Sequence, residues 1–230
     1  MGHKEPLNPT AFDIETEGLR MGKEITVAGL RFPAGVLVLL NSDGQTVPEQ
    51  LEGRVESKSG VDTVQLQQCD SERALLERLH EEATERIQDK NRMIVAYNGE
   101  TWRGGFDLPF LRTRCGKNEV PWPFPDIPYA DLMPIVKKRI NTTVDGEDEP
   151  TEISDLCGAF DVLIGGEHCD PYDDSNEAVS AAYNGDWESL LLHNIADIDR
   201  TQQLADWMQR YVPASDFQLK NLGPPRGGRW

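Results

Sequence analysis

The amino-acid sequence predicts a single α/β domain with a mixed central sheet of about five strands flanked by helices. Three strand-like segments follow one another near the N-terminus, and later strand-like segments alternate with helical ones. The chain has 230 residues, 38% of them hydrophobic, which suffices for one sizeable core. Because no change in composition divides it, we assign residues 1–222 to one domain and residues 223–230 to a flexible basic tail.

The first part of the chain is predicted to form three consecutive strands, in which β-branched and large apolar residues are concentrated. They span residues 10–15, 25–32 and 36–40. Pro33-Ala34-Gly35 separates the second strand from the third as a hairpin turn. Residues 41–68 are rich in turn-forming residues and carry only a weak strand signal, at residues 63–66.

The middle of the chain predicts alternating helices and strands. Apolar residues recur at helical spacing from about residue 71 to residue 87, which indicates an amphipathic helix. Buried strands are predicted at residues 92–97 and 129–132, and a short helix begins near Asp107 between them.

The last third of the chain is predicted to be mainly helical. The clearest helix spans residues 186–210, where apolar side chains line one broad face. Before it, residues 170–177 predict a capped turn that leads into a helix at residues 177–183.

Charge is unevenly distributed along the chain. The formal net charge is −17, yet residues 145–199 hold sixteen acidic side chains and no Lys or Arg. The other residues hold 24 acidic and 23 basic side chains, so they are almost neutral. Nucleic acid is therefore not excluded as a substrate. The acidic segment 145–199 indicates either solvation in high salt or a face that docks a protein partner.

Neither a membrane anchor nor a secretory signal is predicted. The longest apolar runs, at residues 36–40 and 93–97, are the size of a strand and far too short to span a bilayer. Residues 1–6 contain no apolar targeting core. We therefore expect a cytoplasmic protein.

Two carboxylates mark the end of the first predicted strand. Asp13 and Glu15 are two residues apart, so strand alternation sends both side chains to one face of the sheet. Ionised carboxylates are costly to bury unpaired, and coordination of Mg²⁺ or Mn²⁺ by their oxygens would offset that cost. The alternative is an ordinary solvent-exposed strand end.

Two further elements carry residues that suit a metal site. Asp107 opens a helix after a glycine-containing turn, where the alternative role is an ordinary helix cap. His193 and Asp197 lie one turn apart on one face of the long helix. A histidine one turn from a metal-bound carboxylate can activate water; the alternative is a solvated polar stripe.

Taken in order, these three elements resemble the exonuclease motifs of the DEDD superfamily, the DnaQ-like 3′–5′ exonucleases of the ribonuclease-H-like fold. The matching segments are Ala11-Phe12-Asp13-Ile14-Glu15-Thr16, Asn98-Gly99 to Phe106-Asp107 with Leu111, and His193-x-x-x-Asp197. The first two also resemble motifs of the proofreading domains of family B DNA polymerases. Each motif is weak alone, but three in this order on the expected elements are fairly specific.

The resemblance implies a ribonuclease-H-like fold and two-metal hydrolysis of phosphodiester bonds at the 3′ ends of DNA or RNA, above all single-stranded ends. By position, Asp13, Glu15, Asp107 and Asp197 would bind two Mg²⁺ or Mn²⁺ ions. His193 would orient or deprotonate the attacking water.

The sequence departs from the family pattern in two places. One branch of the superfamily has Tyr four residues before the last Asp, and the other has His five residues before it. Here His193 is combined with the shorter spacing, and Ile198 offers no carboxylate at the longer one. The stretch between Asn98 and Asp107 is also longer than in the polymerase motif, so residues 100–105 would reshape the substrate groove.

Candidate nucleic-acid contacts lie beside the second motif and in the densest basic run. Asn98, Trp102 and Arg103 belong to the first group, and Trp102 could stack on a terminal base. Lys137 and Lys138 begin the basic run and could contact phosphates. The alternatives are that Trp102 covers the core and that the run is a solvated helix face.

Two other functions stay open on the sequence alone. A catalytically silent nucleic-acid-binding or partner-docking domain of the same fold would gain nothing from four clustered carboxylates. A structure-specific endonuclease would use the same residues as an exonuclease, and the sequence does not separate these two enzymes.

Overall fold

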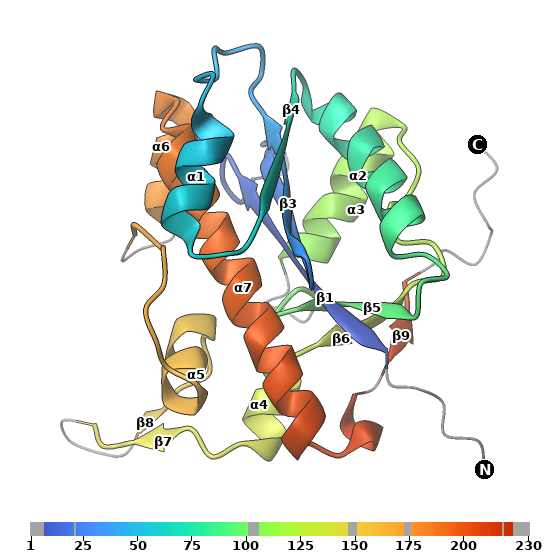
Figure 1. Ribbon diagram of the computed structural model, residues 1–230. Helices are drawn as coiled ribbons and strands as arrows, with labels where there is room; N and C mark the ends of the chain where they lie inside the picture. Colours follow the sequence, from blue (N-terminus) through green and yellow to red (C-terminus); the bar gives the residue numbers. More distant parts are fainter. Residues whose placement is uncertain are drawn as a thin grey trace.

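A computed structural model shows an α/β fold in which helices cover both faces of a seven-stranded mixed sheet (Figure 1). The structure describes residues 7–20, 22–100, 106–146, 151–172, 176–217 and 219–222. The predicted basic tail, residues 223–230, lies outside the described residues. Among the described helices, none is both long enough and apolar enough to cross a bilayer.

The sheet has the order β4-β3-β2-β1-β5-β6-β9. Its strands are β1 (Asn8–Thr16), β2 (Ile25–Phe32), β3 (Gly35–Asn41), β4 (Val64–Cys69), β5 (Arg92–Ala96), β6 (Pro128–Asp131) and β9 (Lys220–Asn221). β2 is antiparallel to β1 and to β3, and β9 is antiparallel to β6. The other neighbouring pairs, β1 with β5, β5 with β6 and β3 with β4, are parallel.

The mixed character of the sheet is confirmed, but the expected number of about five strands is wrong. β4 lies at one edge and reads Val-Gln-Leu-Gln-Gln-Cys, so its partly exposed glutamines weaken the apolar pattern. β9, at the other edge, has two exposed residues and no pattern from which a strand could be predicted. Edge strands are short and polar because they bury little of their surface.

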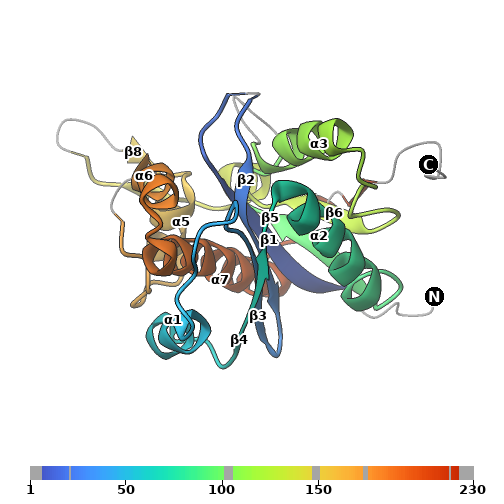
Figure 2. The ribbon, with the colours of Figure 1, turned by 90° about the horizontal axis from the view of Figure 1, so that it is seen from above.

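Two helical layers enclose the sheet (Figures 1 and 2). α2 (Glu72–Arg86) and α3 (Asp107–Asn118) cover one face, where Phe12, Leu30 and Leu76 are buried. The other face carries α1 (Leu51–Ser59), α4 (Met133–Arg139), α5 (Leu156–Leu163), α6 (Asn176–Asn184) and α7 (Trp187–Tyr211). A small hairpin, β7 (Thr143–Val144) with β8 (Thr151–Glu152), precedes α5, and a 3₁₀ turn, η1 (Ala214–Asp216), follows α7.

Most helices fall where the sequence predicts them, and α1 is the clearest exception. It occupies part of the segment expected to be turn-rich, because only Leu51 and Val55 are buried in it and its periodic signal is weak. α3 begins at Asp107, as predicted, and runs through Gly116 to Asn118.

The longest helix, α7, packs across β1 and β2 at a point where β2 has no side chain. Gly29 of β2 lies opposite Asp13 of β1 in the antiparallel ladder. A Cβ atom at Gly29 would lie 2.0 Å from Oδ1 of Asn194 in α7 and 3.2 Å from Cδ1 of Ile198. Glycine at this position therefore lets α7 approach the sheet closely enough for Asn194 to reach Asp13.

We predict that Gly29→Ala lowers the free energy of unfolding by about 1–3 kcal/mol, because the added methyl group overlaps the buried Asn194 side chain, so that either its hydrogen bond to Asp13 breaks or α7 moves away from β2. Urea unfolding of the purified variant measures this. Gly53→Ala in α1 is the control, since a Cβ atom there meets nothing within 4 Å, and it should be neutral or stabilising by about 0.5–1 kcal/mol. Equal stability of Gly29→Ala and wild type would contradict the proposed close approach.

Candidate active site

The first predicted motif lies on β1, where it leaves the core. Asp13 and Glu15 alternate with buried residues along this strand and project to the same face. Both line a cleft of about 510 Å³, together with His193 and Asp197 of α7. The apolar part of the cleft wall comes from Ile14, Leu19, Phe106 and Val179.

Asp107 enters from the other side of the sheet as the first residue of α3. Phe106 occupies the N-cap position and no side chain caps this helix, so the alternative that Asp107 is an ordinary cap is wrong. The Leu108 amide donates to the Gly99 carbonyl at 3.0 Å and ties the start of α3 to the chain that follows β5. A Cβ atom at Gly99 would lie 2.6 Å from Cβ of Ala96 and 2.9 Å from the Tyr129 hydroxyl. Glycine therefore lets the backbone pass close to these two residues.

α7 supplies the third motif on the face turned toward β1. Asn194 donates from Nδ2 to Oδ2 of Asp13 at 2.9 Å. Nε2 of His193 lies 3.9 Å from Oε1 of Glu15 and 3.9 Å from Oδ2 of Asp197. His193 is buried, so it is not part of a solvated polar stripe. The structure therefore brings Asp13, Glu15, Asp107, His193 and Asp197 together from three separate elements.

The crowding of these carboxylates dominates the electrostatics of the site. Burial raises the pKa of Asp13 well above its usual range, and the charges of Asp107, Glu15 and Asp197 raise it further. The pKa of Asp107 is raised by burial and by its acidic neighbours in the same way. Burial also raises the pKa of Glu15, to about 7, although the neighbouring His193 opposes this shift.

The donor set fits divalent cations. Within the described part of the chain, no basic side chain or hydrogen-bond donor is paired with the Asp107 carboxylate, although the residue is buried. Hard carboxylate oxygens in a cluster are the ligands that Mg²⁺ and Mn²⁺ prefer. The residues present therefore suit the metal ions that the sequence predicts.

His193 is held from its other side by a residue outside the three motifs. Its Nδ1 donates to Oδ1 of Asp170 at 2.8 Å. Burial opposes a charged imidazole, but the hydrogen bond to Asp170 and the charges of Glu15 and Asp197 outweigh burial and raise the pKa of His193 to about 9.

Arg200 links this hydrogen bond to the fourth carboxylate. One of its guanidinium nitrogens lies 2.8 Å from Oδ2 of Asp170 and 2.8 Å from Oδ1 of Asp197. Burial opposes ionisation of Asp170, but hydrogen bonds from His193 and Arg200 prevail and lower its pKa to about 2.

Asp170, His193 and Asp197 form a second possible metal-binding group. Their ligand atoms lie within 4.8 Å of one another. Arg200 already bonds both carboxylates, however, and supplies the positive charge that a metal ion would bring. We therefore assign the divalent cations to the side of the site formed by Asp13, Glu15 and Asp107 with Asp197.

The sequence does not predict roles for Asp170, Asn194 and Arg200. Asp170 falls in the predicted capped turn, and its distance along the chain from His193 gives no signal. Arg200 could have been found, because it lies three residues after Asp197, on the same helix face, and is the first basic residue after the acidic segment.

Only some of the predicted nucleic-acid contacts lie among the residues that the structure describes. Trp102 and Arg103 lie outside the described residues. Asn98 has a left-handed backbone (φ 62°), and its amide donates to Oδ1 of Asp131 at 2.9 Å. Its side-chain Oδ1 is buried and has no hydrogen-bond partner among the described residues. Asn98 is thus placed to shape the turn that follows β5.

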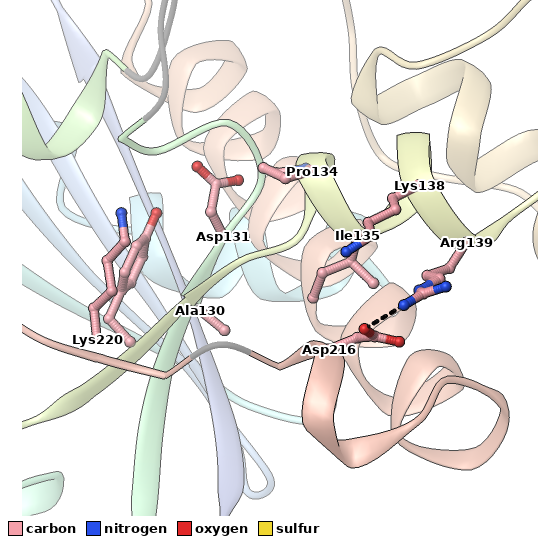
Figure 3. Close-up of a pocket in the computed structure, with 9 residues that line it drawn as sticks. Ala130, Asp131, Pro134, Ile135, Lys138, Arg139, Asp216 and Lys220 are labelled. Atoms are coloured by element: carbon pink, nitrogen blue, oxygen red, sulfur yellow. Dashed lines mark hydrogen bonds and ion pairs between the residues drawn. The ribbon is translucent and has the colours of Figure 1, made fainter.

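Lys137 and Lys138 lie on the exposed side of α4, and Lys138 lines a second cavity of about 250 Å³ (Figure 3). In Figure 3, Lys220 of β9 lies at one end of this cavity and Arg139, paired with Asp216, at the other, with Asp131 between them. Lys220 pairs with Glu100. Because Asp131 accepts hydrogen bonds from the amides of Asn98 and Glu100, the cavity adjoins the turn that follows β5.

Comparison with known proteins assigns no family. No family model matches the chain, and no curated protein matches it significantly.

We predict that Mg²⁺ stabilises the protein, because it relieves repulsion among the buried carboxylates. A Mg²⁺ concentration about 100-fold above Kd should raise the free energy of unfolding by about 2.7 kcal/mol. Asp107→Asn should be more stable than wild type without metal and should respond less to Mg²⁺. Asp199→Asn is the matched control, since Asp199 is on the same helix as Asp197 but pairs with Arg31. Loss of the Mg²⁺ response in both variants would contradict the assignment.

Without metal, stability should fall as pH rises from about 5 to 8. The folded protein holds a proton on Glu15 up to a pKa of about 7, whereas the unfolded chain releases it near its ordinary value. This proton stabilises the folded protein fully below the pKa of Glu15 in the unfolded chain. The stabilisation is lost as pH rises to the pKa of Glu15 in the folded protein. Glu15→Gln should therefore flatten the plot of the free energy of unfolding against pH, and remove a change on the order of 3 kcal/mol between about pH 5 and 8. Urea unfolding in EDTA at several pH values tests this, and parallel profiles would refute it.

Proposed function

We propose that the protein is a metal-dependent 3′–5′ exonuclease of the DnaQ-like DEDD superfamily, with a ribonuclease-H-like fold, that hydrolyses single-stranded ends of DNA or RNA. The observation that carries this proposal is the meeting of residues from three motifs: Asp13, Glu15, His193 and Asp197 line one cleft, and the buried Asp107 carboxylate lies close enough to raise the pKa of Asp13. A domain that only binds nucleic acid has no use for buried carboxylates that repel its substrate.

The carboxylates would hold two Mg²⁺ or Mn²⁺ ions, which supply electrostatic stabilisation of the phosphodiester and activation of water when bound. Asp13, Glu15, Asp107 and Asp197 are the proposed ligands. Asn194 fixes the Asp13 carboxylate through one oxygen and leaves the other for coordination. Arg200 does the same for Asp197.

His193 would accept the proton of the attacking water at Nε2. This atom faces the carboxylates, while Nδ1 is occupied by Asp170. The charges of Glu15 and Asp197 help to raise the pKa of the imidazole to about 9. Neutralisation of Glu15 and Asp197 by bound cations would lower the pKa of His193. Nε2 would then lose its proton and be able to accept one from water.

The phosphate backbone needs basic groups despite the net charge of −17. Lys138, Arg139 and Lys220 gather around the cavity in Figure 3, which adjoins the turn at Asn98. We propose that this cavity accommodates part of the strand beyond the reacting phosphodiester bond. Lys138 would contact phosphate directly, and Lys137 would add to the local positive potential.

We predict that the wild type releases mononucleotides from single strands only when Mg²⁺ or Mn²⁺ is present. With separate 3′-labelled and 5′-labelled substrates, the 3′ label should be lost first. Asp13→Ala and Asp197→Ala should lower kcat by at least about 10³-fold, and His193→Ala by about 10²-fold. Asp199→Asn, outside the cleft, is the control for each.

The outcome of the assay separates the alternative functions. Internal cuts in both labelled substrates would show an endonuclease of the same fold. Metal-independent binding without loss of nucleotides would show a catalytically silent domain. Undiminished activity in both aspartate variants would refute the assigned site.

A further inference from the structure

We propose that Asp170 is a positioning residue, which holds the His193 ring with Nδ1–H toward itself and Nε2 toward the carboxylate cluster. The effect of Asp170 on catalysis rests on the proposed nuclease function. Its effect on which ring nitrogen of His193 carries the proton does not. No motif of the sequence includes Asp170.

The geometry around His193 divides the two ring nitrogens between different tasks. Nδ1 makes a hydrogen bond of 2.8 Å to Asp170, whereas Nε2 lies 3.9 Å from both Glu15 and Asp197. An ionised carboxylate only accepts hydrogen bonds, so the proton must be on Nδ1. Nε2 is then the nitrogen left without a proton in the neutral ring. This is the tautomer that can accept a proton on the side of the cleft.

Asp170 is itself rigidly held. Its side chain is 3% exposed, and its oxygens accept from Arg200, His193 and the backbone amide of Tyr172. The ring of Tyr172 packs beside His193, with the ring centroids 5.4 Å apart. The thiol of Cys169 donates to the Leu192 carbonyl at 3.3 Å. The segment from Cys169 to Tyr172 is therefore fastened to α7 around the histidine.

The two oxygens of Asp170 serve three donors. Oδ1 accepts from His193 and from the Tyr172 amide, and Oδ2 accepts from Arg200, which is buried and donates only. An asparagine has a single acceptor oxygen for these three donors. If the charged Arg200 retains that oxygen, the amide NH₂ turns toward Nδ1 and the Tyr172 amide, and Nδ1 has to become the acceptor. The His193 proton then moves to Nε2, where it blocks proton transfer.

The isosteric substitution Asp170→Asn distinguishes a positioning role from a packing role. Asp170→Asn preserves volume and most hydrogen bonds, so a packing role predicts activity close to wild type. The positioning role predicts that Asp170→Asn and Asp170→Ala both lose about 10- to 100-fold in kcat with little change in KM. Asp199→Asn is the matched control, because it removes a carboxylate that pairs with an arginine outside the site.

The state of the ring is measured independently of activity by NMR of protein labelled with ¹⁵N-histidine, at about pH 10, above the pKa of about 9 of His193, where the ring is neutral. We expect a low-field Nδ1 proton signal in wild type and Asp199→Asn, assigned through its absence in His193→Gln. The signal should disappear in Asp170→Ala and in Asp170→Asn. Circular dichroism and urea unfolding of the variants establish that they are folded.

The results separate the two proposals. A wild type without nuclease activity would refute the proposed function, and the NMR signal would still decide the role of Asp170. Persistence of the Nδ1 signal in Asp170→Ala would overturn the positioning role. So would a kcat of Asp170→Asn within about threefold of wild type in an active nuclease.

Discussion

The mutual repulsion of four neighbouring carboxylates is the constraint on which the arrangement of this molecule depends. Asp13 and Glu15 arrive on β1, Asp107 on α3 and Asp197 on α7, so three elements have to be held rigidly against each other's charge. Hydrophobic packing supplies that rigidity, because apolar layers on both faces of the sheet fix the elements behind the cleft. The stability of the core is what makes so unfavourable a concentration of charge possible.

α7 reconciles these two requirements within a single helix. One side buries apolar residues such as Leu190, Ile198 and Leu204 against the sheet. His193, Asn194, Asp197 and Arg200 follow one another on the side toward the cleft, at spacings that keep them within reach of each other. A shift of this helix along the sheet would disturb the carboxylate, the histidine and the arginine together. The absence of a side chain at Gly29 is therefore a condition for the whole site.

The sequence allowed the prediction of those parts of the site that depend on local periodicity. Asp13 and Glu15 could be assigned to one strand face because residues two apart in a strand project to the same side. His193 and Asp197 could be assigned to one helix turn because residues four apart in a helix lie next to each other. Asp170 could not be found in this way. It reaches His193 from a loop, through a contact between residues 23 positions apart, and no regular element fixes their relation. β9 escaped prediction for a similar reason, since two exposed residues pair with β6 only because the chain returns there.

The acidic segment 145–199 illustrates the limit of counting charge along a chain. Several of its acids perform local structural tasks: Asp155 caps α5 and Asp186 caps α7. Others meet basic residues from elsewhere in the sequence. Glu188 pairs with Arg54 and Lys58, and Asp199 pairs with Arg31.

Asp170 and Asp197 share Arg200, the residue at which the run without basic side chains ends. The acidic segment lacks basic residues of its own, but folding brings basic side chains of β2 and α1, and Arg200 at its end, next to its acids. Only those acids without such partners require solvation in high salt or a protein partner as an explanation. A nucleic acid approaching the cleft meets the folded distribution of charge, in which part of the acidity is already neutralised by the protein itself.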